Sequence, residues 1–137
     1  YITGNTDQYA TEVAMEEVVK QADVLSFHIP LTRETTNLVD DEYLFHFRKP
    51  IFFLMGARGG IVHIPAIIKA LDKGKILGAA FDVLPVEKFP KLGEQSWYNN
   101  LIARNNVIFS PHVAGWTFES YYKLSDILAD KIIRDQQ

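Results

Sequence analysis

The chain has 137 residues, a formal net charge of −3 and no cysteine. Its length and its apolar fraction of 47% suit one globular domain with a real core. The charge gives no electrostatic basis for binding nucleic acid or an anionic membrane, and the absence of cysteine excludes disulfides and thiolate chemistry. The sequence contains no apolar run long enough to cross a bilayer and no signal-peptide pattern at its start, so a cytoplasmic protein is expected.

The first third of the chain predicts two short helices around one strand. The helical spacing of Met15, Val18 and Val19 indicates the first helix. Pro30 ends the strand, because proline cannot donate to a sheet ladder. In order, the predicted elements are a loop over 1–12, a helix over 13–21, a strand over 23–27, a loop over 32–37 and a helix over 40–47.

The middle of the chain predicts two strands joined by an amphipathic helix. The strand over 51–55 is continuously apolar, which is typical of a strand covered on both faces. A turn follows it, formed by Gly56, Gly59 and Gly60. The next helix places its apolar side chains at i, i+3, i+4 and i+7, starts near Pro65 and ends near Gly74; these side chains are Ile64, Ile67, Ile68 and Leu71. The following strand, over 76–83, is rich in Gly and Ala, which indicates a close neighbour.

The last third predicts a long connection, a short strand and a long helix. The connection over 84–105 is long enough to be functional or to carry a helix of its own. A strand over 107–109 follows, and a helix runs from Thr117, its expected N-cap, to about residue 134. Helices and strands therefore alternate along the chain, and this alternation predicts an α/β fold with a parallel sheet and right-handed crossovers.

Charged and titratable side chains come from the ends of three successive predicted strands. They are Arg58, Asp82, Glu87 and His112. Ligands of open parallel sheets bind outside the carboxyl ends of the strands, where these residues would meet. Histidine suits acid–base catalysis near neutral pH, a carboxylate beside it would fix one tautomer, and arginine can grip a carboxylate with two hydrogen bonds.

Each of these residues also has a plain structural interpretation. Arg58 could form a surface ion pair, Glu87 could be a solvated loop acid, and Asp82 could be a turn or N-cap acid. Structural roles are favoured for the other three histidines, with a cofactor contact left open only for His28. The sequence shows no metal-ligand spacing, phosphate-binding P-loop or G-x-S-x-G elbow.

Four segments, ADVLSFHIPLT, GARGG, FDVLPVE and SPHVAGWT, together resemble the D-isomer-specific 2-hydroxyacid dehydrogenases. The resemblance covers about residues 13–134. It implies a Rossmann-like parallel sheet flanked by helices and NAD as the cofactor. It also implies interconversion of a 2-oxo acid and a D-2-hydroxy acid by hydride transfer.

The same resemblance implies roles for individual residues. Arg58 matches the arginine that binds the substrate, His112 the acid–base histidine and Glu87 its paired acid. Asp82 matches the aspartate that meets the nicotinamide amide. Positions that line NAD in the family correspond to Pro30, Gly56, Ala57, Arg58, Asp82, His112, Val113, Ala114 and Gly115. Two departures stand out: Met55-Gly56 replaces the usual Asn-Thr or Asn-Cys, and the usual Glu-x-Glu-Pro loop keeps only its second acid.

The resemblance places the glycine-rich phosphate turn and most of the substrate domain before Tyr1. We therefore expect residues 1–137 to form the second half of an NAD-binding domain, with 117–137 leading towards the substrate domain of a homodimeric enzyme. The fragment alone is expected to be inactive and to expose a strand edge and an apolar face. The substrate, and the choice between NAD and NADP, stay open.

Two alternatives compete with this interpretation. The first is a non-catalytic, NAD-sensing relative resembling a corepressor, which retention of Arg58, Glu87 and His112 argues against. The second is a flavodoxin-like binding module. Such a module needs a glycine in the phosphate loop after its first strand, and residues 27–33 contain none.

Overall fold

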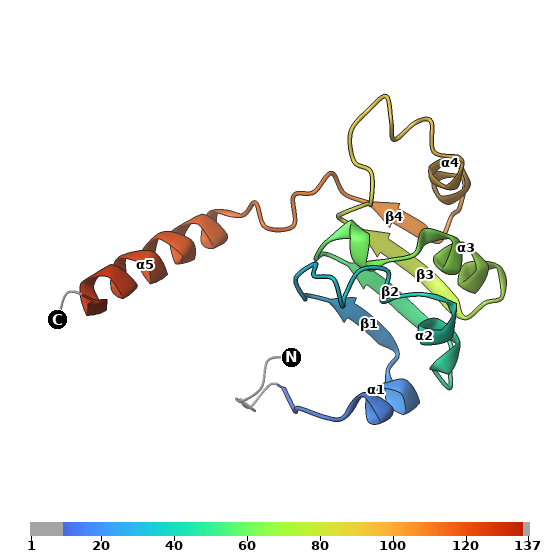
Figure 1. The fold of residues 1–137 in the computed structure, drawn as a ribbon, viewed down its shortest axis with the longest axis horizontal. Helices are drawn as coiled ribbons and strands as arrows, with labels where there is room; N and C mark the ends of the chain where they lie inside the picture. The colour runs from blue at the N-terminus through green and yellow to red at the C-terminus, as the bar shows by residue number, and fades with distance from the viewer. Residues whose placement is uncertain (1–9, 136–137) are drawn as a thin grey trace.

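The computed structural model describes residues 10–135 and contains four strands and five α-helices over that range (Figure 1). Most of the loop predicted over 1–12 lies outside the described residues. The other predicted elements are present, most of them within one or two residues of their expected ends. They are α1 (Met15–Gln21), β1 (Val24–Phe27), α2 (Asp41–His46), β2 (Ile51–Met55), the 3₁₀ helix η1 (Gly59–Ile61), α3 (Ile64–Asp72), β3 (Ile76–Phe81), α4 (Ser96–Ile102), β4 (Val107–Phe109) and α5 (Phe118–Asp135).

The strands form one parallel sheet in the order β1-β2-β3-β4, as the alternation of elements predicts. Helices α2 and α3 pack together over one face of the sheet, and α4 packs beside β4 (Figure 1). The long connection after β3 carries α4, which is one of the two possibilities that its length raised. Parallel pairing brings the carboxyl ends of all four strands to one edge.

A row of phenylalanines crosses the covered face. Phe27, Phe53, Phe81 and Phe109 come from the four successive strands, and neighbouring ring centroids lie 5.8, 5.9 and 5.7 Å apart. These are ordinary separations for favourable aromatic pairs. The row fixes the register of the strands near their carboxyl ends, where the loops of interest begin.

The opposite face of the sheet is not covered by any of the described residues. Along β2, Ile51, Phe53 and Met55 are buried, whereas Phe52 is 49% exposed and Leu54 38% exposed. The expectation that β2 is covered on both faces is therefore wrong for this chain, while the expected uncovered apolar face is confirmed. A continuous apolar run indicates that both faces of a strand need to be buried, but it does not indicate which segment buries the second face.

The Gly and Ala content of β3 also has a local explanation. A Cβ built on Gly78 would lie 3.3 Å from the Phe52 ring and 3.2 Å from the Asn106 carbonyl oxygen. The close neighbour that the sequence indicated is therefore the adjacent strand β2, on the uncovered face. Strand β3 ends at Phe81, two residues earlier than predicted.

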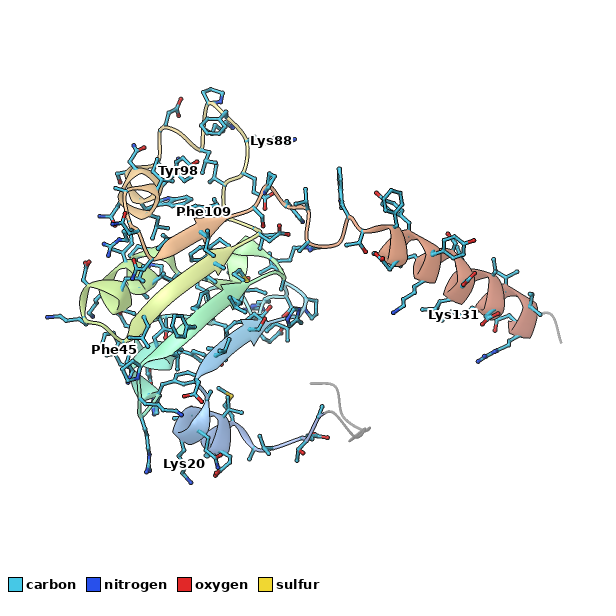
Figure 2. The ribbon with its side chains drawn as sticks, turned by 180° about the vertical axis from the view of Figure 1, so that it is seen from behind. Lys20, Phe45, Lys88, Tyr98, Phe109 and Lys131 are labelled. Carbon is cyan, nitrogen blue, oxygen red and sulfur yellow. The ribbon has the colours of Figure 1, made fainter. Side chains whose placement is uncertain are left out.

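Helix α5 projects away from the sheet and its helices (Figures 1 and 2). Its predicted N-cap is confirmed, since Thr117 Oγ1 accepts the N–H of Ser120 at 3.0 Å. No described residue of α5 is buried, and Phe118 is 92% exposed. Within the described range, no helix is both long and apolar enough to cross a membrane.

Candidate active site

Three loops leave the carboxyl edge of the sheet side by side. The backbone ladder continues one residue past two of the strands: Asp82 N donates to Met55 O, and Ser110 N donates to Phe81 O, each at 2.9 Å. The loops after β2, β3 and β4 therefore start at the same level. They carry Arg58, Glu87 and His112, respectively, so the predicted convergence at one edge is confirmed.

Glu87 and His112 are in direct contact. Glu87 Oε2 lies 3.0 Å from His112 Nδ1, and Glu87 Oε1 accepts the N–H of Leu84 at 3.2 Å. A carboxylate only accepts hydrogen bonds, so we assign the Nδ1 hydrogen to this contact. The Nε2 atom of His112 is then the one left to face a substrate. The pair borders a cavity of about 540 Å³.

Asp82 organises the loop that carries His112. Its Oδ1 accepts the Ser110 hydroxyl at 2.5 Å and the N–H of Val113 at 2.9 Å, and its Oδ2 accepts the N–H of Ala114 at 3.1 Å. Burial pulls the pKa of Asp82 upward, but these three hydrogen bonds and the nearby His112 outweigh burial and hold the pKa below its usual value. The carboxylate is therefore held as an anion beneath the loop that carries His112.

The backbone at His112 is in the left-handed region, with φ of 57°. A residue other than glycine reaches this region only when its surroundings impose it. The two N–H groups that follow His112 both point to Asp82, and Trp116 N closes a turn onto Val113 O at 2.8 Å. The direction of the His112 side chain is therefore set by the backbone of the turn as well as by Glu87.

Arg58 lies at the same edge but makes no hydrogen bond to Glu87 or His112 among the described residues. Its Nη1 donates to Ala57 O at 2.8 Å. It borders a hollow of about 470 Å³ together with the loop after β1, including His28 and Pro30. The guanidinium is thus folded back beside an open space of a size suited to a small ligand.

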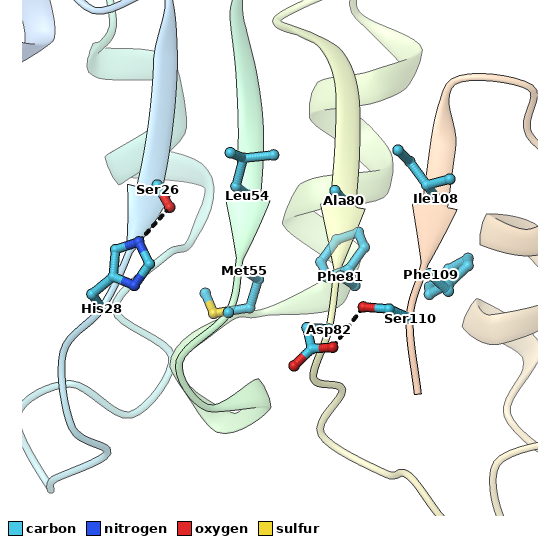
Figure 3. A pocket seen from close by; sticks show the side chains of 11 residues that line it. Ser26, His28, Leu54, Met55, Ala80, Phe81, Asp82, Ile108, Phe109 and Ser110 are labelled. Carbon is cyan, nitrogen blue, oxygen red and sulfur yellow. Dashed lines mark hydrogen bonds between the residues drawn. The ribbon is translucent and has the colours of Figure 1, made fainter. Parts of the chain in front are cut away.

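A shallow pocket of about 320 Å³ lies over the ends of all four strands (Figure 3). Its floor is mostly apolar, and its polar groups are at the strand ends. The Asp82 carboxylate has room for about four hydrogen bonds, of which the protein supplies three. One acceptor site is left for a carboxamide N–H. These residues therefore fit the nicotinamide end of NAD.

Of the other positions predicted to line NAD, Ala57 borders the hollow beside Arg58, and four more lie near the pocket or in the His112 turn. Gly56 has no atom within 4 Å of the place where a Cβ would sit, so the strand end beside the pocket is open to a flat ring. Gly115 is equally open. The N–H groups of Val113 and Ala114 are already engaged by Asp82, so any contact they make with NAD must use other atoms.

Two polar residues of the site escaped the sequence interpretation. Ser110 bonds Asp82, and Ser26 Oγ lies 2.8 Å from His28 Nε2 in the same pocket (Figure 3). Both serines stand at strand ends, which is the signal that could have identified them. Among the described residues, no cluster of His, Asp and Glu could hold a metal ion.

Comparison with known proteins agrees with this geometry. The sequence matches the family model described as D-isomer specific 2-hydroxyacid dehydrogenase, NAD binding domain, over residues 3–114. A glyoxylate reductase from Thermofilum pendens is 33% identical over 119 residues, covering 87% of this chain and 33% of the relative. A glycerate dehydrogenase from Methylorubrum extorquens is 37% identical over 120 residues, which cover 88% of this chain and 37% of the relative. The chain spans about a third of the length of these curated relatives.

The fold is also shared with solved structures. The crystal structure of D-lactate dehydrogenase with NAD+ from Lactobacillus jensenii has a TM-score of 0.80 at 30% sequence identity. That match covers 96% of this chain and 43% of the other, so the fold is shared over nearly the whole length of this chain.

Proposed function

Because this chain belongs to the D-isomer-specific 2-hydroxyacid dehydrogenase family, we propose that the protein interconverts a small 2-oxo acid and a D-2-hydroxy acid, with NAD as the cofactor. The observation that carries the proposal is the Glu87–His112 contact of 3.0 Å at the sheet edge that also bears Arg58. We assign residues 1–137 to the second half of the NAD-binding domain, with 117–137 leading towards a substrate domain.

Each residue has a chemical task in this proposal. When bound, NADH supplies the hydride. Arg58 swings from Ala57 O to grip the substrate carboxylate with two hydrogen bonds and to polarise the oxo group. His112 Nε2 gives its proton to the substrate oxygen as negative charge develops there, and takes it back in the oxidative direction. Glu87 stabilises the charged imidazole and keeps its ring aimed.

Asp82 has a double role in the proposal. It holds the His112 turn with its occupied acceptor sites, and it offers the remaining one to the nicotinamide carboxamide. The nicotinamide ring and the turn that carries His112 are thereby oriented by one carboxylate. Such positioning contributes a large share of catalysis when two reactants must meet.

Assembly and location are part of the same proposal. We place the enzyme in the cytoplasm as a homodimer, with no nucleic acid or membrane as a partner. The lack of cysteine, which gives no support for a secreted disulfide scaffold, supports the location. The exposed apolar residues of the sheet and of α5 support association with further protein.

The decisive experiment is NADH oxidation by the full-length protein with a panel of 2-oxo acids. Glyoxylate and pyruvate belong in the panel, because similar proteins are a glyoxylate reductase and a D-lactate dehydrogenase. Turnover of pyruvate that yields only D-lactate supports the proposal, whereas glycolate, the product from glyoxylate, is achiral and reports turnover alone. NADH binding without turnover of any 2-oxo acid would favour the NAD-sensing alternative instead.

A further inference from the structure

Gly59 is the point at which the Arg58 loop touches the Glu87 loop. A Cβ built on Gly59 would lie 2.0 Å from Leu84 C, 2.2 Å from Leu84 O and 2.4 Å from Pro85 N. These are backbone atoms, so no side-chain rotation could relieve the overlap. The space that glycine leaves is therefore filled by the main chain of the neighbouring loop.

The touching segment is also the one that anchors Glu87. The N–H of Leu84 donates to Glu87 Oε1, and the other oxygen of that carboxylate holds His112 Nδ1. On its other side, Gly59 follows Arg58 directly and begins η1. One glycine thus stands between the substrate arginine and the backbone that aims the acid–base pair.

We propose that Gly59 is a positioning residue that sets the spacing between Arg58 and the Glu87–His112 pair. Any side chain here pushes the segment at Leu84 away from β2, and Glu87 moves with it. This inference rests on the proposed function for its kinetic consequence, but the displacement of Glu87 from His112 does not depend on any activity.

The adjacent glycine provides a matched control. A Cβ on Gly60 would meet only the side chain of Leu31, at 3.0 and 3.3 Å. Leu31 is 46% exposed, so its side chain can turn aside. Gly59→Ala and Gly60→Ala therefore add the same methyl group to the same turn, one against backbone and the other against a movable side chain.

The first test is kinetic and uses the full-length enzyme. We expect Gly59→Ala to lower kcat with the 2-oxo acid by about 10²-fold, the cost of a misplacement near 1 Å, while the Kd of NADH stays unchanged. Gly60→Ala should keep the wild-type kcat. Equal kcat values for Gly59→Ala and the wild type would overturn the inference.

A double-mutant cycle with Glu87→Gln separates positioning from general damage. If Gly59 acts through Glu87, the two substitutions together should cost no more than the larger one alone. Effects on kcat that simply multiply would contradict the inference. Should Gly59→Ala fail to fold, Pro85→Gly loosens the same segment without adding atoms, and the same non-additivity with Glu87→Gln is expected.

The second readout is independent of catalysis. In ¹⁵N spectra of the 137-residue chain, the His112 Nδ1–H signal of the wild type should report its bond to Glu87. That signature should be lost in Gly59→Ala and kept in Gly60→Ala, and its retention in both would overturn the inference. If the wild-type enzyme reduces no 2-oxo acid, the proposed function fails, while this comparison still decides the role of Gly59.

Discussion

Ser110 donates its hydroxyl hydrogen to Asp82 at 2.5 Å, which ties the end of β4 to the end of β3. The same carboxylate also receives the two N–H groups that follow His112. The turn that carries His112 is therefore mounted on an anion at the end of the neighbouring strand. The charge state of that anion should matter for stability.

Stability should depend on pH through Asp82. Its pKa is lowered in the folded chain, so its contribution is fully present above the pKa of an unfolded aspartate and is lost as pH falls through the folded value. Asp82→Asn should therefore lower Tm at neutral pH, and the gap to the wild type should close in acid. Thermal unfolding across a pH series measures this. Asp130→Asn on the exposed face of α5 is the control, and a gap that stays constant in acid would contradict the assignment.

Removing the acid–base pair should abolish turnover but not cofactor binding. His112→Asn in the full-length enzyme should lower kcat by about 10²–10⁴-fold, the usual contribution of a positioned acid–base group. Glu87→Gln should act in the same direction with a smaller loss and a changed pH–rate profile, because the charge facing Nδ1 is gone. NADH titration checks that binding is intact. Unchanged turnover in the His112 variant would rule out its role.

Arg58→Ala should chiefly impair use of the 2-oxo acid. The variant loses the bidentate grip on the substrate carboxylate, so KM should rise and kcat should fall, while the Kd of NADH stays close to wild type. Arg104→Ala is a suitable control, because Arg104 forms an ion pair with Asp72 away from the carboxyl ends of the strands. If Arg58→Ala weakened NADH binding alone, the arginine would be a cofactor residue and not a substrate residue.

The uncovered sheet face should drive association of the 137-residue chain. Phe52 pairs with Val24 in the register, Leu54 and Ile108 flank Ala80 in one row across the sheet, and all four apolar side chains are exposed. Phe52→Lys together with Leu54→Lys should shift sedimentation towards a monomer without loss of helix content. Phe89→Lys, on the loop before α4, is the control, since Phe89 is 69% exposed but lies away from this face. Equal association of both variants would place the contact elsewhere.

The 137-residue chain should bind NADH weakly or not at all. Its described residues fit the nicotinamide end of the cofactor, but the sequence contains no G-x-G-x-x-G turn, which would hold the pyrophosphate with backbone N–H groups and a helix N-terminus. Calorimetry with NADH measures the affinity. Binding at micromolar Kd would show that the phosphate turn is dispensable or that the cofactor sits elsewhere.

The fold was largely predictable because its signals are local. The apolar run Ile51–Met55 and the helical spacing from Ile64 to Leu71 each identify an element within a few residues. The Glu87–His112 contact was predictable for a different reason. Parallel strands bring their carboxyl ends to one edge of the sheet, so the residues able to contact His112 are those in the loops at that edge.

The parts that escaped prediction depend on contacts between distant segments. Asp82 reaches its partners 28 to 32 residues away, and only because His112 adopts a left-handed backbone. The overlap at Gly59 involves main-chain atoms of Leu84 and Pro85, which leave no pattern in side-chain chemistry. The apolar pattern of β2 alone predicted cover on both faces, because apolar residues indicate that cover is needed and do not indicate which segment supplies it.

The position of the Asp82 anchor has a mechanical consequence for α5. The loop after β4 is pinned to the sheet as far as Ala114, and the helix starts at Phe118. Bending between the two is thus confined to Gly115, Trp116 and the capping residue Thr117. We therefore expect motion of the helix, about 27 Å long at 1.5 Å per residue, to be taken up in these three residues before it reaches the His112 turn.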